Sequence, residues 1–364
     1  MKVLKTSEKF SVFKNLKKNG TINIIKISNR NSNEINSELN LIKKLNDQSL
    51  FFKERIPKIL NHGTFKSGFF KNKDYYKQQF INGKTLSQII HSKKTKKKDI
   101  KNIKKILIKE LILSTKSFKR FESQKKEKYP NKFLMNELEK IKNKKIYSAL
   151  VKKSKIIINR KKYNNLNYYL KKILFSKKVK ELYFQKNFLS KIGHWNYHGG
   201  NLIFPNKKYR NFKLIDPDSS WKINDPLFSL ARFFYTFPHD TMEYDKYVIF
   251  SPNLKKLEKK EAISFKLKLL WKKNIINNYR TMFLNLYCLY FEEKKIISEL
   301  SSAEFLRLKL SLVLCLLRGV NANYQQEINY QSNKSENFQN KGIFLYLITI
   351  IFLKNLNDYL KKND

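Results

Sequence analysis

The residues best suited to chemistry lie in one stretch, Gly193 to Ala231, which reads GHWNYHGGNLIFPNKKYRNFKLIDPDSSWKINDPLFSLA. A loop that ends at Asn201 leads into an apolar strand, and after a turn a second strand of residues 212–215 ends at Asp216. Pairing of the two strands would bring Asn201 close to Asp216. Mg²⁺ prefers oxygen ligands and keeps waters and substrate phosphates, so an amide and a carboxylate suffice to hold it. The stretch therefore predicts a magnesium and phosphate site.

The spacing within this stretch matches the catalytic loop of kinases. In that loop a catalytic Asp follows a His by two residues, an Asn follows the Asp by five, and a metal-binding Asp comes later. The corresponding positions here are His194, Asn196, Asn201 and Asp216. This arrangement predicts a nucleotide-dependent phosphoryl transfer site.

The loop resembles that of the aminoglycoside phosphotransferase and choline kinase family, which typically reads H-G-D-x-H-x-x-N before a strand ending in I-D. His198 and the later Asp225-Pro226-Leu227 fit this family better than protein kinases. The resemblance implies a bilobal, protein-kinase-like α+β fold. Its small antiparallel β-sheet lobe would span residues 1–80, and a large helical lobe with the catalytic loop would span residues 81–364. It also implies ATP and Mg²⁺ as cofactors.

Two positions depart from the family pattern. Asn196 stands where the family has its catalytic Asp, so the usual general base is missing. Ser229 stands where the family usually has the Asp of a D-L-A motif, and we expect Asp225 to take over part of its bracing role. If the chain is an enzyme, Asn196 positions the acceptor hydroxyl, and the proton goes to one of three candidates. These are His194, His198 and Asp218.

A second candidate pair precedes this stretch. Residues 21–28 (TINIIKIS) alternate and are rich in β-branched side chains, which predicts a strand carrying Lys26. Residues 33–45 keep apolar side chains at helical spacing and carry Glu38. In kinase-like folds a strand Lys contacts the nucleotide phosphates and is held by a helix Glu. Lys26 and Glu38 fit these roles, whereas without the downstream motif both would be ordinary surface residues.

The hinge between the lobes is expected after a strand of residues 75–80. Backbone groups of Gln79, Phe80 and Ile81 would bind adenine there, and residues 81–86 match the family's x-x-G-x-x-L exit. The preceding hairpin, residues 13–20, has a single glycine and no G-x-G-x-x-G pattern, so it gives little support for phosphate binding.

The remainder of the chain reads mainly as helices. The apolar stripe after Thr85 predicts the main helix of the larger lobe, and residues 125–191 are expected to form helices that shape the acceptor pocket. We expect Pro238-His239-Asp240 to end a helix and the polar segment 321–341 to be a long loop.

The composition is strongly basic, with 77 Lys and Arg against 29 Asp and Glu and a formal charge of +48. Such a charge is typical of proteins that bind nucleic acid or anionic lipid. The lysines are spread along the chain, however, and Lys, Asn and Ile are abundant everywhere, which favours a compositional bias instead. We therefore expect no specific nucleic acid partner, and no motif indicates an oligomeric state.

The sequence predicts a cytoplasmic protein with no transmembrane segment. The N-terminus lacks the apolar core of a secretory signal, and the longest apolar run, residues 343–353, is shorter than the roughly 18 residues that span a bilayer. Cys288 and Cys315 lie in apolar helical runs and are expected to be buried thiols. His194 and His198 have the spacing of a helical zinc pair, but two glycines follow and no Glu lies between them.

Three functions are consistent with these features. The favoured one is ATP-dependent phosphorylation of a small-molecule hydroxyl, with a sugar, sugar phosphate or glycan precursor preferred over a polycationic aminoglycoside because the chain is poor in acidic residues. Asn196 keeps open a second function, a pseudokinase or nucleotide-binding scaffold. The third, a basic nucleic-acid-binding protein, rests on charge alone.

Overall fold

The structure is a computed structural model in which two compact units can be described. The described residues are 2–6, 10–17, 19–29, 34–116, 131–182, 193–205, 209, 211–218, 225–250, 262–283, 300–329 and 335–363. Unit 1 consists of Met1–Ile89, Asn102–Phe121 and Leu189–Ser229, and unit 2 of Ile90–Lys101, Glu122–Phe188 and Leu230–Asp364. Helices and mainly antiparallel sheets make up both units, which confirms the predicted α+β class. The expected lobe boundary at residue 80 stays a prediction.

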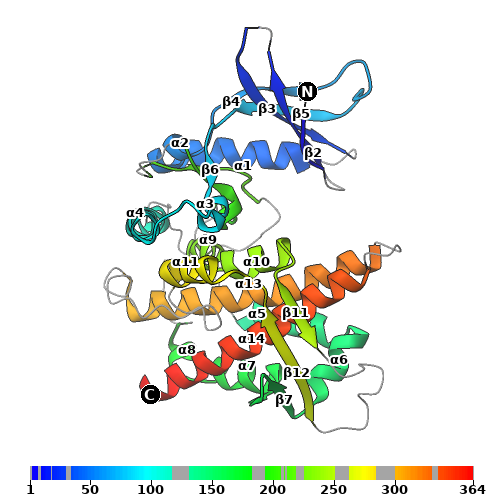
Figure 1. Cartoon of the computed structure of the whole chain (residues 1–364), viewed down its shortest axis with the longest axis vertical. Helices are drawn as coiled ribbons and strands as arrows, with labels where there is room; N and C mark the ends of the chain where they lie inside the picture. The colour runs from blue at the N-terminus through cyan, green and yellow to red at the C-terminus, as the bar shows by residue number, and fades with distance from the viewer. Residues whose placement is uncertain are drawn as a thin grey trace. The chain divides into compact units, whose positions relative to one another are not determined.

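The main sheet of unit 1 has five antiparallel strands in the order β1-β2-β3-β5-β4 (Figure 1). β-Branched side chains favour the strand Ile22–Ser28, and its last four residues are buried, so both of its faces are covered. The strands are β1 (Lys2–Thr6), β2 (Phe10–Leu16), β3 (Ile22–Ser28), β4 (Ile59–Thr64) and β5 (Asp74–Gln79).

Helix α1 (Glu34–Gln48) packs on this sheet with the apolar stripe expected from the sequence. Ile35 and Leu39 form a buried cluster with Tyr76 of β5. Glu38 lies on the same buried face, which a helical spacing of three and four residues requires. A short helix, α2 (Leu50–Arg55), follows and leads into β4. The helix therefore carries one carboxylate to the sheet.

A second, three-stranded sheet in unit 1 holds the loop that the sequence singles out. Its order is β10-β9-β6, formed by Lys213–Leu214, Leu202–Phe204 and Lys84–Thr85. The predicted pairing across the turn is thus confirmed, with Lys213 opposite Ile203 and Leu214 opposite Leu202. Gly83 comes so close to the end of β9 that an added Cβ would lie 2.3 Å from the carbonyl oxygen of Phe204, so only glycine fits there.

Two helices come directly after β6 in the sequence. Helix α3 (Leu86–His91) follows β6, and α4 (Lys97–Lys116) buries the apolar stripe predicted for it, including Ile103, Leu107 and Leu111. In unit 1, Arg55 of α2 donates to Glu110 of α4 at 2.8 Å. This ion pair joins helices from two separate chain segments of unit 1.

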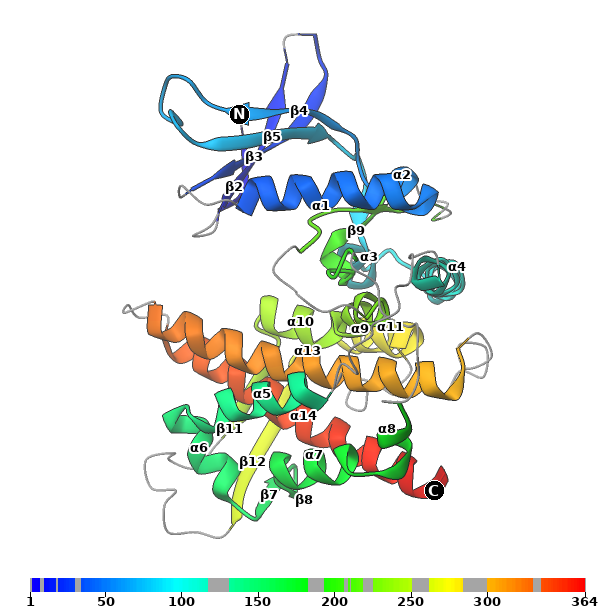
Figure 2. The same cartoon turned by 180° about the vertical axis from the view of Figure 1, so that it is seen from behind.

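Unit 2 is largely helical, and its long helices α13 and α14 lie side by side in both views (Figures 1 and 2). Their facing apolar residues are almost completely buried, as in Leu310, Leu314 and Leu345. The helices of unit 2 are α5 (Asn131–Lys142), α6 (Lys145–Lys152), α7 (Leu166–Leu174), α8 (Lys177–Glu181), α9 (Leu227–Phe234, which begins in unit 1), α10 (Thr236–Glu243), α11 (Lys273–Phe283), α13 (Ser302–Asn329) and α14 (Ser335–Asn363).

A four-stranded sheet in unit 2 was not predicted. Its order is β11-β12-β7-β8, formed by Tyr247–Phe250, Ala262–Leu269, Lys155–Ile158 and Lys161–Asn164. Strands β12 and β7 are parallel, and Ile263, Phe265 and Leu267 alternate as buried residues. The expectation of helices alone for these segments was therefore wrong, because the alternation in residues 262–269 is a strand pattern.

Two predicted helix boundaries were also wrong. Pro238 does not end a helix, because it lies in the first turn of α10, where a missing backbone N–H costs nothing. The segment 321–341 is not one long loop, because α13 continues to Asn329 and α14 begins at Ser335. Polar residues at the ends of long helices were mistaken for a loop.

One helical segment of unit 2, Lys341–Lys362, is long and apolar enough to span a membrane by length and composition. Its most apolar 18-residue window has a mean hydropathy of 1.4, and 72% of that window is buried within the structure, as expected for the core helix of a folded protein. Cys315 is buried, as predicted, whereas Cys288 lies outside the described residues.

Candidate functional site

The centre of the site is the ammonium group of Lys26, on β3. Its Nζ lies 2.6 Å from Oε2 of Glu38 and 2.6 Å from Oδ1 of Asp216. The predicted ion pair between Lys26 and Glu38 is therefore present, and Asp216 joins it. Lys26 and Glu38 are buried, while the side chain of Asp216 is 34% exposed. The one solvent-accessible member of this cluster is a carboxylate.

Burial and charge act in opposite directions on these groups. Burial alone would lower the pKa of Lys26, but the carboxylates of Asp216 and Glu38 outweigh it, and the pKa is raised. Burial would likewise raise the pKa of Asp216, but the charge and hydrogen bond of Lys26 lower it below its ordinary value. For Glu38 burial prevails over Lys26 and the pKa is raised. Lys26 and Asp216 are thus charged at neutral pH.

Two aromatic residues complete the environment of Lys26. The hydroxyl of Tyr76 donates to Oε1 of Glu38 at 2.7 Å, so both oxygens of that carboxylate are occupied. The ring of Phe10 lies 3.9 Å from Nζ of Lys26, a favourable cation–π distance. Neither Phe10 nor Tyr76 was predicted as part of the site. Together they fix the position of Lys26 without using its bond to Asp216.

Backbone and amide hydrogen bonds join the catalytic loop to the strand that ends at Asp216. The amide of Asn196 donates to the carbonyl oxygen of Asp216 at 3.0 Å, and the amide of Asn201 donates to the carbonyl oxygen of Asn196 at 3.2 Å. The backbone N–H of Ile215 donates to the carbonyl oxygen of Asn201. Asp216 itself has φ of 55°, in the left-handed region, so this network holds a strained residue in place.

Two oxygen atoms at this junction are available for a metal ion. Within the described residues, Oδ1 of Asn201 accepts no hydrogen bond, and its orientation is fixed because the amide nitrogen is engaged. Oδ2 of Asp216 is likewise unengaged, since Lys26 takes Oδ1. One amide and one carboxylate oxygen fit Mg²⁺, which completes its shell with water and phosphate. The described chain contains no cluster of three or more His, Cys, Asp or Glu residues that could hold a metal ion.

The environment of Asn196 explains why an amide suits this position. Its NH₂ group donates to a backbone carbonyl, which a carboxylate cannot do. An Asp at this position would place a negative oxygen against the carbonyl of Asp216. Asn196 therefore forms a hydrogen bond with the backbone of Asp216 that the family's usual Asp could not donate.

His194 is a poor candidate for the proton acceptor. Its side chain is fully buried, and neither ring nitrogen has a hydrogen-bond partner in the described chain. Burial lowers the pKa of His194 to about 3, with Asp216 opposing the shift. Its ring packs against Tyr197, and its carbonyl accepts from the N–H of Asp218. The structure thus supports a packing role for His194 instead of the predicted catalytic one.

The two other proton-acceptor candidates are more accessible. His198 is partly exposed and caps the short 3₁₀ turn Gly199–Asn201, accepting from the N–H of Gly200 through Nδ1 at 3.3 Å. Asp218 is partly exposed and lies two residues after Asp216. Their roles in proton transfer stay predictions.

Ser229 braces the catalytic loop, a role the sequence suggested for Asp225. The Oγ of Ser229 accepts from the backbone N–H of Trp195 at 3.0 Å. The Oδ1 of Asp225 accepts from the N–H of Leu227, the first residue of α9, at 2.9 Å, and its part in bracing the loop stays a prediction. Both side chains are fully buried. The hydroxyl of Ser229 therefore contacts the loop directly.

Trp195 stands at the glycine position of the family motif and adopts a conformation that glycine favours. Its φ is 58°, in the left-handed region, which costs a non-glycine residue roughly 1–2 kcal/mol. Its ring covers Gly193, where an added Cβ would lie 2.4 Å from the indole. Packing and the hydrogen bond to Ser229 offset this strain. As predicted, Trp195 is a packing residue; Trp221 lies outside the described residues.

The hinge residues differ in what their backbones offer to a ligand. The N–H of Gln79 donates to the carbonyl oxygen of Lys58 and is therefore engaged. Within the described chain, the backbone groups of Phe80 and Ile81 form no hydrogen bond, and both residues are partly exposed. Phe80 and Ile81 are thus better suited than Gln79 to the predicted adenine contact, which stays a prediction.

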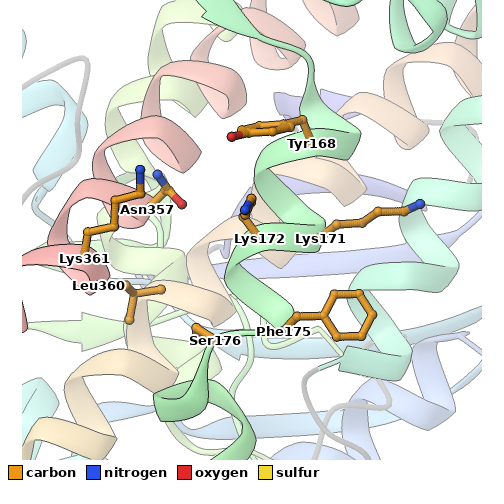
Figure 3. A pocket seen from close by; sticks show the side chains of 8 residues that line it. All are labelled: Tyr168, Lys171, Lys172, Phe175, Ser176, Asn357, Leu360 and Lys361. Atoms are coloured by element: carbon orange, nitrogen blue, oxygen red, sulfur yellow. The ribbon is translucent and has the colours of Figure 1, made fainter. Parts of the chain in front are cut away.

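A separate basic pocket of about 580 Å³ lies in unit 2, between α7 and the end of α14 (Figure 3). Its three lysines, Lys171, Lys172 and Lys361, belong to the last turns of these helices. Positive charge at a helix C-terminus is stabilised by the helix dipole, which itself repels anions. Helix stability is therefore sufficient to explain why these lysines lie here.

Comparison with known proteins supports the fold. No protein-family model matches the sequence, and no curated protein matches it. Among solved structures, the chain is similar to one from Ralstonia eutropha JMP134, described as a "putative aminoglycoside phosphotransferase" (TM-score 0.54, 10% identity, 97% of this chain and 92% of that chain). A MAP kinase from Leishmania major also matches, with a TM-score of 0.30 and 10% identity over 95% of this chain and 82% of that chain. The chain has the bilobal, protein-kinase-like α+β fold that its catalytic-loop motif predicts.

Proposed function

We propose that this protein is a phosphotransferase that moves the γ-phosphoryl group of ATP to a hydroxyl of a small molecule. The observation that carries the proposal is the contact of Lys26 with both Glu38 and Asp216 at 2.6 Å. A kinase-like fold alone supports many functions. A buried Lys held by a Glu, next to an accessible carboxylate, is the arrangement that phosphate and metal binding require.

Each residue has a defined task in this proposal. Asp216 and Asn201 hold Mg²⁺ through the two unengaged oxygens, and Lys26 neutralises phosphate charge. The bound Mg²⁺ would supply charge neutralisation at the β and γ phosphates. Asn196 positions the acceptor hydroxyl. The backbones of Phe80 and Ile81 contact adenine.

The lack of a carboxylate at position 196 does not rule out catalysis. Phosphoryl transfer passes through a loose transition state in which positioning and charge neutralisation supply most of the rate enhancement. His198 and Asp218 are the candidates for accepting the hydroxyl proton, since both are partly exposed. The acceptor is a neutral or anionic molecule such as a sugar, sugar phosphate or glycan precursor, because a chain with 29 acidic against 77 basic residues suits a polycation poorly. Use of ATP fits the cytoplasmic location expected from the sequence.

A pseudokinase is the alternative that Asn196 favours. Such a protein would bind nucleotide through Lys26 and Asp216 but transfer nothing. The available oxygens of Asn201 and Asp216 argue only against a scaffold that binds no nucleotide, because such a protein has no need of a metal site.

Thermal unfolding with nucleotide tests the proposal. Mg-ATP should raise the melting temperature of the native protein, since a ligand that binds only the folded state stabilises it. Asp216→Ala should abolish the part of the shift that depends on Mg²⁺. Asp358→Ala is the matched control, because Asp358 is a partly exposed carboxylate paired with Lys354 in α14, outside the site.

Two results would count against the proposal. An unchanged melting temperature at saturating Mg-ATP would remove the nucleotide site. A Mg²⁺-dependent shift that Asp216→Ala leaves intact would remove the metal assignment. Once binding is established, screening of hydroxyl acceptors by ATP consumption would separate the enzyme from the pseudokinase.

A further inference from the structure

The hairpin formed by β4 and β5 in unit 1 carries an unusual surface at its tip. Phe69, in the loop that joins the two strands, is 96% exposed, more than any other large hydrophobic side chain in the described chain. Single exposed apolar residues are common, so Phe69 alone has no meaning. Three further observations concern the turn that holds it, the rings beneath it and the charges beside it.

The turn is fixed by backbone hydrogen bonds rather than left free. The N–H of Phe65 donates to the carbonyl of Lys73, and the N–H of Asn72 donates back to the carbonyl of Phe65. A further bond runs from the N–H of Lys71 to the carbonyl of Gly68, whose φ of 79° suits glycine. Phe69 is therefore held outward by an ordered turn.

A cluster of aromatic rings supports the turn from below. Phe70 packs against Phe13 with ring centres 5.5 Å apart and against Phe65 at 5.8 Å. Phe65 in turn packs on Tyr75 of β5 at 4.4 Å. Phe69 contacts Phe70 edge to face at 5.1 Å. The exposed ring is the outermost member of a packed aromatic cluster, which connects the tip to the sheet.

The charges beside Phe69 are positive. Lys66 and Lys71 flank it in the sequence, and both are exposed. The one acidic residue of the hairpin, Asp74, accepts hydrogen bonds from Thr64 at 2.6 Å and Asn36 at 3.0 Å, so its carboxylate is already engaged. The tip thus combines an exposed aromatic ring with two ammonium groups that have no carboxylate partner in the described chain.

We propose that this hairpin tip, defined by Lys66, Phe69 and Lys71, docks the protein on an anionic phospholipid surface. The ring of Phe69 inserts at the boundary between headgroups and acyl chains, and the two lysines bind lipid phosphates. Aromatic insertion and attraction to anionic lipid are the two contributions that hold peripheral proteins on membranes. The proposal does not depend on phosphotransferase activity.

The test must separate insertion of Phe69 from general attraction, because a chain of charge +48 binds any anionic vesicle weakly. We would place a reporter at the tip with Phe69→Trp and add phosphatidylglycerol vesicles carrying acyl chains that are brominated and quench tryptophan. The variant should show a blue-shifted emission that the bromolipid quenches, beyond the signal of the three native tryptophans. Phosphatidylcholine vesicles should have much less effect.

Phe175 provides the matched control. It is 70% exposed and lies beside Lys171, Lys172 and Lys180, yet no aromatic cluster supports it in the described chain. Phe175→Trp should show no bromolipid quenching. Phe69→Ser should lower the partition coefficient on anionic vesicles about tenfold, as loss of one buried ring implies, whereas Phe175→Ser should not.

Either of two outcomes would overturn the proposal. One is that Phe69→Trp shows no additional quenching on anionic vesicles, which would leave an acidic protein as the partner of this tip. The other is that the Phe175 variants behave like the Phe69 variants, which would show that binding depends only on the net positive charge of the protein. Unchanged melting temperatures for all variants, expected for exposed positions, show that the fold is not the cause.

Discussion

The ammonium of Lys26 lies 2.6 Å from the carboxylate of Asp216, although 190 positions separate the two residues in the sequence. This contact connects the main sheet of unit 1 to the strand pair β9–β10. The oxygen of Asp216 that Lys26 leaves unengaged is the one available to a metal ion. A single carboxylate therefore serves both the ion pair and the proposed metal site.

Replacing Lys26 with Met should destabilise the protein by about 3–5 kcal/mol, because it leaves the buried carboxylate of Glu38 without its cation. The pKa of Glu38, already raised, would rise further, so the folded state would bind a proton that the unfolded state does not. The deficit should thus be largest at neutral pH and shrink as the pH falls. Urea unfolding at pH 7.5 and 5.5 measures it. Lys77→Met, on the neighbouring strand β5, is the control, and an equal deficit there would contradict the explanation.

Asn196→Asp distinguishes an adapted enzyme from a decayed kinase. In an adapted enzyme the change should leave turnover the same or lower it, because Asp cannot donate to the carbonyl of Asp216 and adds a negative charge beside the phosphates. Stability should fall by about 1–3 kcal/mol from the lost hydrogen bond. The measurements are Mg-ATP hydrolysis and acceptor phosphorylation. A rise in turnover toward the 10² to 10⁴-fold that a general base typically contributes would instead identify a decayed kinase.

Ser229→Ala should destabilise the protein by about 1–3 kcal/mol, since the buried N–H of Trp195 loses its acceptor. It should also lower turnover, because the loop that carries Asn196 loses a restraint. Ser87→Ala is the matched control. The Ser87 hydroxyl is buried but has no hydrogen-bond partner in the described chain, so its removal should cost little. Equal losses in the two variants, measured by urea unfolding, would show that Ser229 acts by packing alone.

His194 should make the protein sensitive to acid. Burial lowers the pKa of His194 to about 3 from an ordinary value of 6.5, so below pH 6.5 the unfolded state binds a proton that the folded state excludes. Stability from this residue is therefore complete above pH 6.5 and declines as the pH falls toward 3. At pH 5 the loss should be about 2 kcal/mol.

The variant His194→Phe should remove this part of the acid dependence. The measurement compares the change in unfolding free energy between pH 7 and pH 5 for the native protein and the variant. His62→Gln is the control, because His62 is exposed on β4. If His194→Phe leaves the slope unchanged, the imidazole is protonated in the folded state.

The sequence could predict those parts of the site that depend on short-range patterns. Lys26 and Glu38 lie on a strand and the next helix, both of which the local residue pattern predicts, and the resemblance of the downstream motif to kinases predicts that they pair. Asn201 comes just before β9 and Asp216 just after β10, and the turn residues between these strands indicated that the two residues lie close together.

Contacts that depend on strand register or on helix placement could not be predicted. Tyr76 reaches Glu38 because β5 pairs with β3 so that Tyr76 lies opposite Lys26, and a shift of one residue would turn its side chain to the other face. From the sequence, Ser229 is only a departure from the family's usual Asp. Nothing in the sequence shows that a hydroxyl in α9 lies within hydrogen-bond distance of Trp195. The parallel pairing of β7 with β12 joins segments more than 100 residues apart, beyond the reach of local patterns.

Unit 1 is made of three separate chain segments, which affects how it folds during synthesis on the ribosome. Residues 1–89 belong to unit 1, and its last segment ends at residue 229, which is made 140 residues later. At about 5–20 residues per second, a nascent chain needs roughly 7–28 s to cover that length. During most of this interval the residues of the main sheet have been made but Asp216 has not, and Glu38 is the carboxylate that pairs with Lys26 within the described part of residues 1–89. Co-translational folding of unit 1 therefore finishes with the ion pair on which its proposed chemistry depends.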